Sequence, residues 1–225
     1  MKLLRMAARL AYKDLQIEIR TGEIVISTTL FGVLVTILGS LSFYLDPVMS
    51  IQVAPGVLWI TITFSGLLAM SRSWARERDN DVIRALLLAP IPRAAIFLGK
   101  ALGVLAFLTL VELVLVPLTG LFFHIDFGAK WKMLLAILAL GSVGFVAAGT
   151  LFTALSVRTR ARDLTLSVVV FPLVTPALLA AVVATRELLG NAPWSEIDAW
   201  LRILGAFALV FVAGGIALFD LLMRE

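Results

Sequence analysis

Cysteine is absent from this 225-residue chain, and histidine occurs only once, at position 124. Without cysteine the chain can form neither disulfides nor thiolate nucleophiles, and it cannot build a cysteine metal site. Charged residues are also scarce, at 15% against about a quarter in an ordinary soluble domain. The apolar tracts contain no paired acid and base and no nucleophile beside a base, which argues against an intramembrane enzyme.

A phosphate-binding loop is missing as well. Such a loop ends in Gly-Lys-Ser or Gly-Lys-Thr, so that its backbone amides cradle phosphate groups. Here Gly99 and Lys100 are followed by Ala101, and Ala94 stands where the first glycine of the motif belongs. We therefore expect any ATP hydrolysis linked to this protein to occur on a separate chain.

What the chain has in abundance is apolar sequence. Hydrophobic residues make up 61% of it and the mean hydropathy is +1.04, values typical of an integral membrane protein. A helix needs about 20 mainly apolar residues to cross the bilayer, and the strict alternation of a β-barrel is not seen. The sequence predicts an all-α membrane protein whose residues 1–225 form one transmembrane domain. Its six predicted spans are 24–45, 53–71, 96–122, 133–156, 164–185 and 201–222.

Lysine and arginine gather in three segments on one predicted side of the membrane, which the positive-inside rule assigns to the cytoplasm. Both termini are then cytoplasmic, and the bilayer rather than nucleic acid is the expected partner of these cations. The opposite loops are short, the longest being "ELLGNAPWSEIDAW", and carry fewer cations. The three basic segments contain Lys2, Arg5, Arg9, Lys13 and Arg20; Arg72, Arg76, Arg78, Arg84, Arg93 and Lys100; and Arg158, Arg160 and Arg162.

Residues 1–23 are predicted to form an interfacial helix rather than a cleavable signal peptide, because charges break every apolar run before position 24. Its polar face repeats every three or four residues and is suited to anionic headgroups. The residues of this face are Lys2, Arg5, Arg9, Lys13, Gln16 and Arg20. Asp14 and Glu18 fall on the apolar side, and we expect them to pair with basic groups of a neighbouring loop. An ordinary solvated cytoplasmic end is the alternative interpretation.

The charged connection between the second and third spans is followed by a leucine run. Asp79, Asn80 and Asp81 are good helix caps, residues 82–89 make about two turns, and prolines 90 and 92 end the helix. An exposed apolar surface beside charge favours contact with a partner protein or the membrane surface. The sequence thus predicts a short coupling helix, with a solvated loop as the alternative. Its candidate contact residues are Arg76, Glu77, Arg78, Asp79, Asp81, Arg84, Leu86, Leu87 and Leu88, with Asp14 and Glu18 as weaker candidates.

Glu112 is the one carboxylate well inside a predicted span. Placing an ionisable group at membrane depth costs about 2.5–3.5 kcal/mol, so Glu112 should face protein or water. Two interpretations stay open: a hydrogen bond to another helix, or a role in coupling or substrate passage.

Two other spans carry packing signals. Pro172 and Pro176 predict a kink or break in the fifth span, because each removes a backbone hydrogen bond. Gly141, Gly144 and Ala148 form a small-residue stripe that favours close helix packing, within the chain or across a dimer.

Several stretches resemble a known family. "ARERDND" and "LLLAPIPRAAIFLGK" are similar to the connection between the second and third spans of type-2 ABC exporter permeases. The whole chain resembles the heme exporter protein B family of cytochrome c maturation, through "YKDLQIEIRT", "PGVLWITITFSGLLAMSRSWARERDND", "LLLAPIPRAAIFLGKALG", "LVELVLVPL" and "GTLFTALSVRTRARD".

The resemblance implies a permease subunit in a bacterial inner membrane. Its partners would be a separate ATP-binding subunit, a second copy of itself and heme-handling membrane proteins, with two copies of each ABC subunit. It implies no cofactor bound directly by this chain, Mg-ATP on the partner, and heme as a possible cargo; ATP hydrolysis would drive heme export or release of a heme-loaded periplasmic chaperone. A non-transporting adaptor that docks the ATPase to heme-handling proteins is the alternative. A single histidine cannot supply both axial ligands of heme, so we expect His124 to be an interfacial polar residue.

Overall fold

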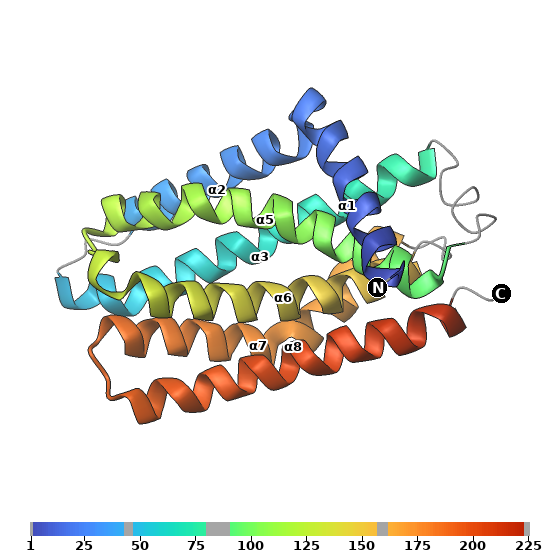
Figure 1. Ribbon diagram of the computed structural model, residues 1–225. Coiled ribbons are helices and arrows are strands. Elements are labelled where there is room, and N and C mark those ends of the chain that lie inside the picture. Colours follow the sequence, from blue (N-terminus) through green and yellow to red (C-terminus); the bar gives the residue numbers. More distant parts are fainter. Residues whose placement is uncertain (1, 43–46, 80–90, 157–161, 223–225) are drawn as a thin grey trace.

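The computed structural model describes residues 2–42, 47–79, 91–156 and 162–222 (Figure 1). These residues form helices without any strand, and six of the helices are long and apolar enough to cross a membrane, which confirms the predicted all-α membrane fold. The elements are α1 (Lys2–Thr21), α2 (Glu23–Ser42), α3 (Pro47–Asp79), α5 (Arg93–Phe123), the 3₁₀ turn η1 (Gly128–Lys130), α6 (Trp131–Ser156), α7 (Arg162–Leu189) and α8 (Trp194–Leu222).

The six long helices run roughly along one direction, and α1 crosses them at one end of the bundle (Figure 1). That end, where α3 finishes and α5 begins, carries Arg72, Arg76, Arg93 and Lys100, and is called the basic end below. Helix α8 finishes at the same end (Figure 1). Helix α3 packs against α2 and α5 on one side and against α6 and α7 on the other, and so connects these two helix pairs.

Helix α3 extends well beyond the span predicted at 53–71. Its 33 residues reach about 50 Å, more than the roughly 30 Å of hydrocarbon. The helix therefore continues through the charged residues 72–79, which hydropathy alone marks as the end of a span.

The longest predicted outer loop is much shorter than expected. Helix α7 continues to Leu189 and α8 begins at Trp194, so residues 190–193 alone connect them. Asn191 adopts a left-handed conformation (φ 61°), and the amide of Ala192 donates to the carbonyl of Glu187. This C-cap geometry reverses the chain within four residues, so that α7 and α8 lie side by side. The residues on either side of the turn are helical and do not belong to a loop.

The small-residue stripe on α6 packs within the chain. Gly141 lies against the ring of Trp59 on α3, and Gly144 lies against Phe207 on α8, while Ala148 is fully buried. The prediction of close helix packing is confirmed, since a methyl group at either glycine would sit within 3 Å of these rings.

Helix α7 is continuous through Pro172 and Pro176. The predicted break does not occur, and a kink within the continuous helix stays a prediction. Deeper in the bundle, the indole Nε1 of Trp59 donates a 2.9 Å hydrogen bond to Thr185 Oγ1, which ties α3 to α7 inside the apolar core.

Candidate functional site

Helix α1 crosses α5 at two glycines one turn apart. The position of a Cβ on Gly99 would be 2.7 Å from Leu10 Cβ and 3.0 Å from the carbonyl oxygen of Ala7, and one on Gly103 would be 3.4 Å from Asp14 Oδ2. Because neither glycine carries a side chain, the two backbones approach closely. This contact fixes the amphipathic N-terminal segment on the basic end of the bundle.

An ion pair buried at this crossing joins the same two helices. Lys100 Nζ of α5 lies 2.8 Å from Asp14 Oδ2 of α1, and the side chains are 2% and 10% exposed. The Lys100 ammonium also lies 6.0 Å from the ring centroid of Trp74 on α3, within cation–π range. Lys13, which is 40% exposed, contacts the other oxygen of Asp14 at 3.2 Å.

The second acid of α1, Glu18, joins three helices. Its Oε1 accepts hydrogen bonds from the amides of Ile24 and Val25 at 2.7 and 2.8 Å, so that it caps the first turn of α2. Its Oε2 lies 3.3 Å from the guanidinium of Arg76 on α3, which also contacts Glu23 at 3.6 Å. Glu18 is only 4% exposed.

Together these contacts form a cluster that we call the α1 anchor: Asp14, Glu18, Arg76 and Lys100. It connects α1, α2, α3 and α5 at the basic end. The expectation that both acids pair with basic groups is confirmed, but their partners Arg76 and Lys100 lie within α3 and α5 and not in a loop. Both acids are buried, however, so any influence they have on a partner must act through the position of α1.

The other predicted coupling residues are less fully described. Glu77, Arg78 and Asp79 lie in the last turn of α3. Asp81, Arg84, Leu86, Leu87 and Leu88 lie outside the described residues, as do Asn80 and the predicted helix at 82–89. The coupling role of this segment stays a prediction.

Glu112 lies in the middle third of α5. It is 7% exposed, and the hydroxyl of Ser142 on α6 donates to its Oε1. Each of these residues is about three helical turns, or roughly 16 Å, from the end of its helix opposite the basic end. The interpretation of Glu112 as a hydrogen-bond partner of another helix is supported, and the sequence did not single out Ser142 as that partner.

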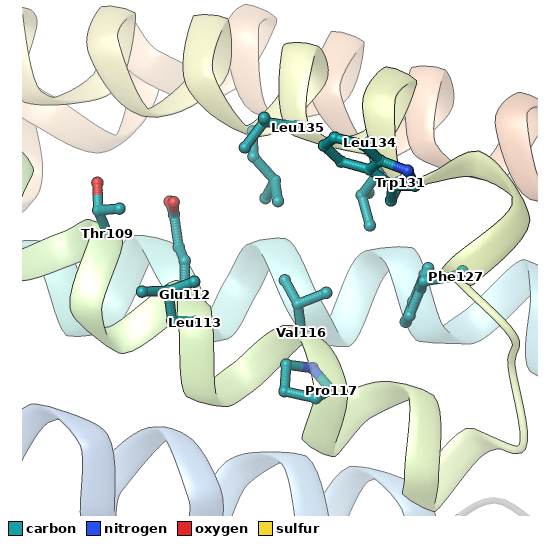
Figure 2. A pocket seen from close by; sticks show the side chains of 11 residues that line it. Thr109, Glu112, Leu113, Val116, Pro117, Phe127, Trp131, Leu134 and Leu135 are labelled. Atoms are coloured by element: carbon teal, nitrogen blue, oxygen red, sulfur yellow. The ribbon is translucent and has the colours of Figure 1, made fainter.

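Glu112 also lines a cavity of about 330 Å³ between α5 and α6 (Figure 2). In this view the side chains of Thr109 and Glu112 point from α5 toward α6, and Leu135 points back from α6. The remaining walls are apolar or backbone: Leu113, Val116, Pro117, Phe127, Gly128, Trp131, Leu134 and Leu138. An apolar cavity with one carboxyl group can bind an apolar molecule or side chain that carries a hydrogen-bonding group.

His124 follows α5 as its C-terminal cap, with φ 55°. It is exposed and does not line the cavity. No group of three or more histidine, cysteine or acidic side chains able to hold a metal ion occurs among the described residues.

Comparison with known proteins identifies the family. The model of the CcmB protein family matches residues 5–219. The chain belongs to this family. A heme exporter protein B of Haemophilus influenzae is 27% identical over 194 residues, 86% of each chain. The protein of the same name from Paracoccus denitrificans is 31% identical over 136 residues, 60% of this chain and 62% of the relative, and that of Bradyrhizobium diazoefficiens is 26% identical over 203 residues, 90% of each.

The match confirms the family resemblance drawn from the sequence motifs. It covers all six spanning helices and the α1 anchor. Sequence reasoning missed Lys100 as an anchor residue, because a lysine near the start of a span looks like an ordinary positive-inside charge. The spacing of Gly99 and Gly103 is the signal that could have revealed the crossing of α1.

Proposed function

We propose that this protein is the membrane permease subunit of an ABC transporter of cytochrome c maturation, located in a bacterial inner membrane. The observation that carries the proposal is membership of the CcmB family over nearly the whole chain, with relatives named heme exporter protein B. Heme is then the expected cargo, and the permease itself is not an enzyme. The six apolar helices give it the form of a multi-pass membrane protein.

The basic end is proposed to face the cytoplasm, by the positive-inside rule. Helix α1 begins and α8 finishes at this end, which supports cytoplasmic placement of both termini (Figure 1). ATP, and any subunit that hydrolyses it, would then meet α1, the end of α3 and the start of α5. The partner subunit would bind Mg-ATP, and two copies of each chain would form the core of the complex.

Residues 80–90 are proposed to receive the motion of the ATP-binding subunit. They connect α3 to α5, and both of these helices are joined to α1 by the α1 anchor. A displacement of the connection would therefore be passed to α1, α3 and α5 together, because breaking a buried ion pair from one side costs about 3–5 kcal/mol. This arrangement supports coupling, to heme export or to release of a heme-loaded chaperone.

A reconstitution experiment tests the function. Inside-out vesicles containing the purified complex, including its ATP-binding and heme-handling subunits, are supplied with heme and ATP. Transport into the vesicle lumen that requires ATP supports the permease. Normal assembly and ATP turnover without accumulation of heme would reject heme export. ATP-dependent release of a heme-loaded chaperone from the same complex would then still support coupling, and its absence would indicate the adaptor function, in which the chain only docks the ATPase to heme-handling proteins.

A second experiment tests the coupling surface. Replacing Leu86 and Leu87 with glutamate should reduce co-purification of the ATP-binding subunit, because the apolar contact would then bury two charges. The same double substitution at Leu30 and Leu34, exposed on α2 inside the membrane, is unsuitable as a control because it would impair insertion. Lys132→Glu, exposed in the first turn of α6 at the opposite end of the bundle, is the control for an added acidic side chain away from the proposed contact surface. Undiminished co-purification of the leucine variant contradicts the coupling assignment.

A further inference from the structure

Helix α1 lies where the membrane-spanning part of the chain begins. Only Gly22 separates its last residue, Thr21, from Glu23, where the first apolar span starts. Gly22 has a φ of 64°, and its amide donates a 2.6 Å hydrogen bond to the carbonyl of Glu18, so the chain turns sharply at this position. Helix α1 therefore does not extend α2 outward but crosses the basic end of the bundle (Figure 1). This crossing places α1 at the level of the lipid headgroups.

The α1 anchor removes both acids of α1 from the helix surface. Asp14 and Glu18 are 8% and 4% exposed, and they pair with Lys100 of α5 and Arg76 of α3. In the sequence these two acids interrupt the amphipathic pattern of the helix. In the folded chain they do not, because no acidic side chain of α1 is left exposed.

A row of unpaired cations occupies the exposed side of α1. Arg5, Arg9 and Arg20 are exposed, and helical spacing places them on one strip about 22 Å long, which we call the arginine strip. None of the three forms an ion pair with another described residue. Four arginines elsewhere each lie 2.6 to 3.4 Å from a carboxylate: Arg72, Arg76, Arg186 and Arg202. The cations of the arginine strip repel one another, and an external anion would relieve this repulsion.

An apolar strip runs beside the arginine strip on the same helix. Leu4, Tyr12 and Ile19 are 65%, 64% and 80% exposed, and they recur every two helical turns, so they share one face. This face lies roughly a quarter of a turn from the arginines. Adjacent apolar and cationic strips are the pattern of a helix that lies in the membrane interface, and tyrosine is enriched at that level.

We propose that the exposed side of α1 binds anionic phospholipids, with the arginine strip on the phosphate groups and the apolar strip among the upper parts of the acyl chains. Charge complementarity supports this occupant, because arginine binds phosphate with two parallel hydrogen bonds. Each arginine near an anionic membrane surface favours binding by about fivefold. A soluble protein fits less well, because α1 lies at a level where lipid already surrounds apolar side chains. The surface depends on neither heme nor ATP, so it goes beyond the proposed function.

Enrichment of lipid beside α1 can be measured on the purified chain in vesicles. The chain contains no cysteine, so Gln16→Cys provides a single attachment site for a fluorophore beside the arginine strip. The vesicles contain equal amounts of phosphatidylglycerol and phosphatidylcholine, and in parallel samples one lipid or the other carries a nitroxide quencher near its headgroup. The ratio of the two quenching efficiencies reports how strongly the anionic lipid gathers at the label. Leu41→Cys, 75% exposed in the last turn of α2 at the opposite end of the bundle, is the control position.

The quenching ratio at residue 16 should exceed that at residue 41 by at least about threefold. Replacing the three residues of the arginine strip with glutamine should bring the two ratios together, and Arg9→Gln alone should have part of this effect. Arg72→Gln is the matched control: it removes a cation at the same end of the bundle that already lies 3.4 Å from Glu23, and it should change the ratio little. Salt provides a test without substitution. Raising the ionic strength from about 0.1 M to about 1 M shortens the Debye length from about 10 Å to about 3 Å, and should lower the ratio at residue 16.

Equal ratios at residues 16 and 41 would overturn the proposal, and so would a high ratio at residue 16 that survives both the triple substitution and high salt. Absence of quenching at residue 16 by either lipid would also overturn it, because the exposed side of α1 would then lie in water. Loss of the quenching when the ATP-binding subunit is added would assign the surface to that subunit instead. The measurement on the isolated chain uses neither heme nor nucleotide, so its failure would leave the permease function standing, and ATP-dependent heme transport is measured separately.

Discussion

Removing Lys100 from the α1 anchor should destabilise the protein substantially. In Lys100→Met the side chain keeps a similar length, but Asp14 loses its 2.8 Å partner while it stays largely buried. Breaking a buried pair from one side costs about 3–5 kcal/mol, because the remaining charge has no compensation. Lys13 stays 3.2 Å from the other oxygen of Asp14, so we expect a loss near the lower limit, about 3 kcal/mol.

Thermal unfolding of the purified chain in detergent measures this loss. For a protein of this length about 3 kcal/mol corresponds to a fall in Tm of about 6–12 °C. Intrinsic fluorescence is a suitable signal, because Trp74 lies beside Lys100 and the chain contains five tryptophans. Lys13→Met is the matched control: it removes a cation from the same carboxylate, but at an exposed position where pairing contributes about 0–1 kcal/mol.

The double variant Asp14→Leu with Lys100→Met identifies the cause. Replacing both members of a buried pair with apolar side chains is often close to neutral, so the double variant should be more stable than Lys100→Met alone. The reasoning is refuted if Lys100→Met melts within about 2 °C of the parent protein. It is also refuted if the double variant is less stable than Lys100→Met, because the loss would then come from the shape of the side chains and not from an unpaired charge.

Three further variants test the remaining contacts by the same melting assay. Glu18→Ala removes the cap of α2 and a buried partner of α3, and should cost about 2–4 kcal/mol, whereas Glu23→Ala at a 62% exposed side chain should cost less than about 1 kcal/mol; equal effects would contradict the cap. Gly99→Ala pushes a methyl group against the backbone of α1 and should cost about 1–3 kcal/mol, while Gly205→Ala on α8 meets open space and should cost nothing; the opposite order would show that α1 does not pack there. Trp59→Phe should cost about 1–2 kcal/mol through the lost hydrogen bond to α7, and an unchanged Tm would show that this bond contributes nothing net.

Residues 72–79 show where sequence reasoning stopped short. Hydropathy ends the second span near position 71, because it measures the transfer of side chains into lipid. It does not indicate whether the backbone stays helical beyond the lipid. The structure continues α3 to Asp79. The sequence predicts a loop at residues 194–200 for the same reason, but these residues form the first turns of α8.

Composition and charge alone determined that this chain is a helical membrane protein with six spans, because the cost of placing backbone and charge in hydrocarbon is a local property that can be read residue by residue. The family resemblance also rested on local motifs. Only the tertiary structure decided which partners Asp14, Glu18 and Glu112 have, because Lys100, Arg76 and Ser142 lie 86, 58 and 30 residues away in the chain. The cavity beside Glu112 depends on the same long-range packing, since it exists only because α5 and α6 lie side by side without filling the space between them.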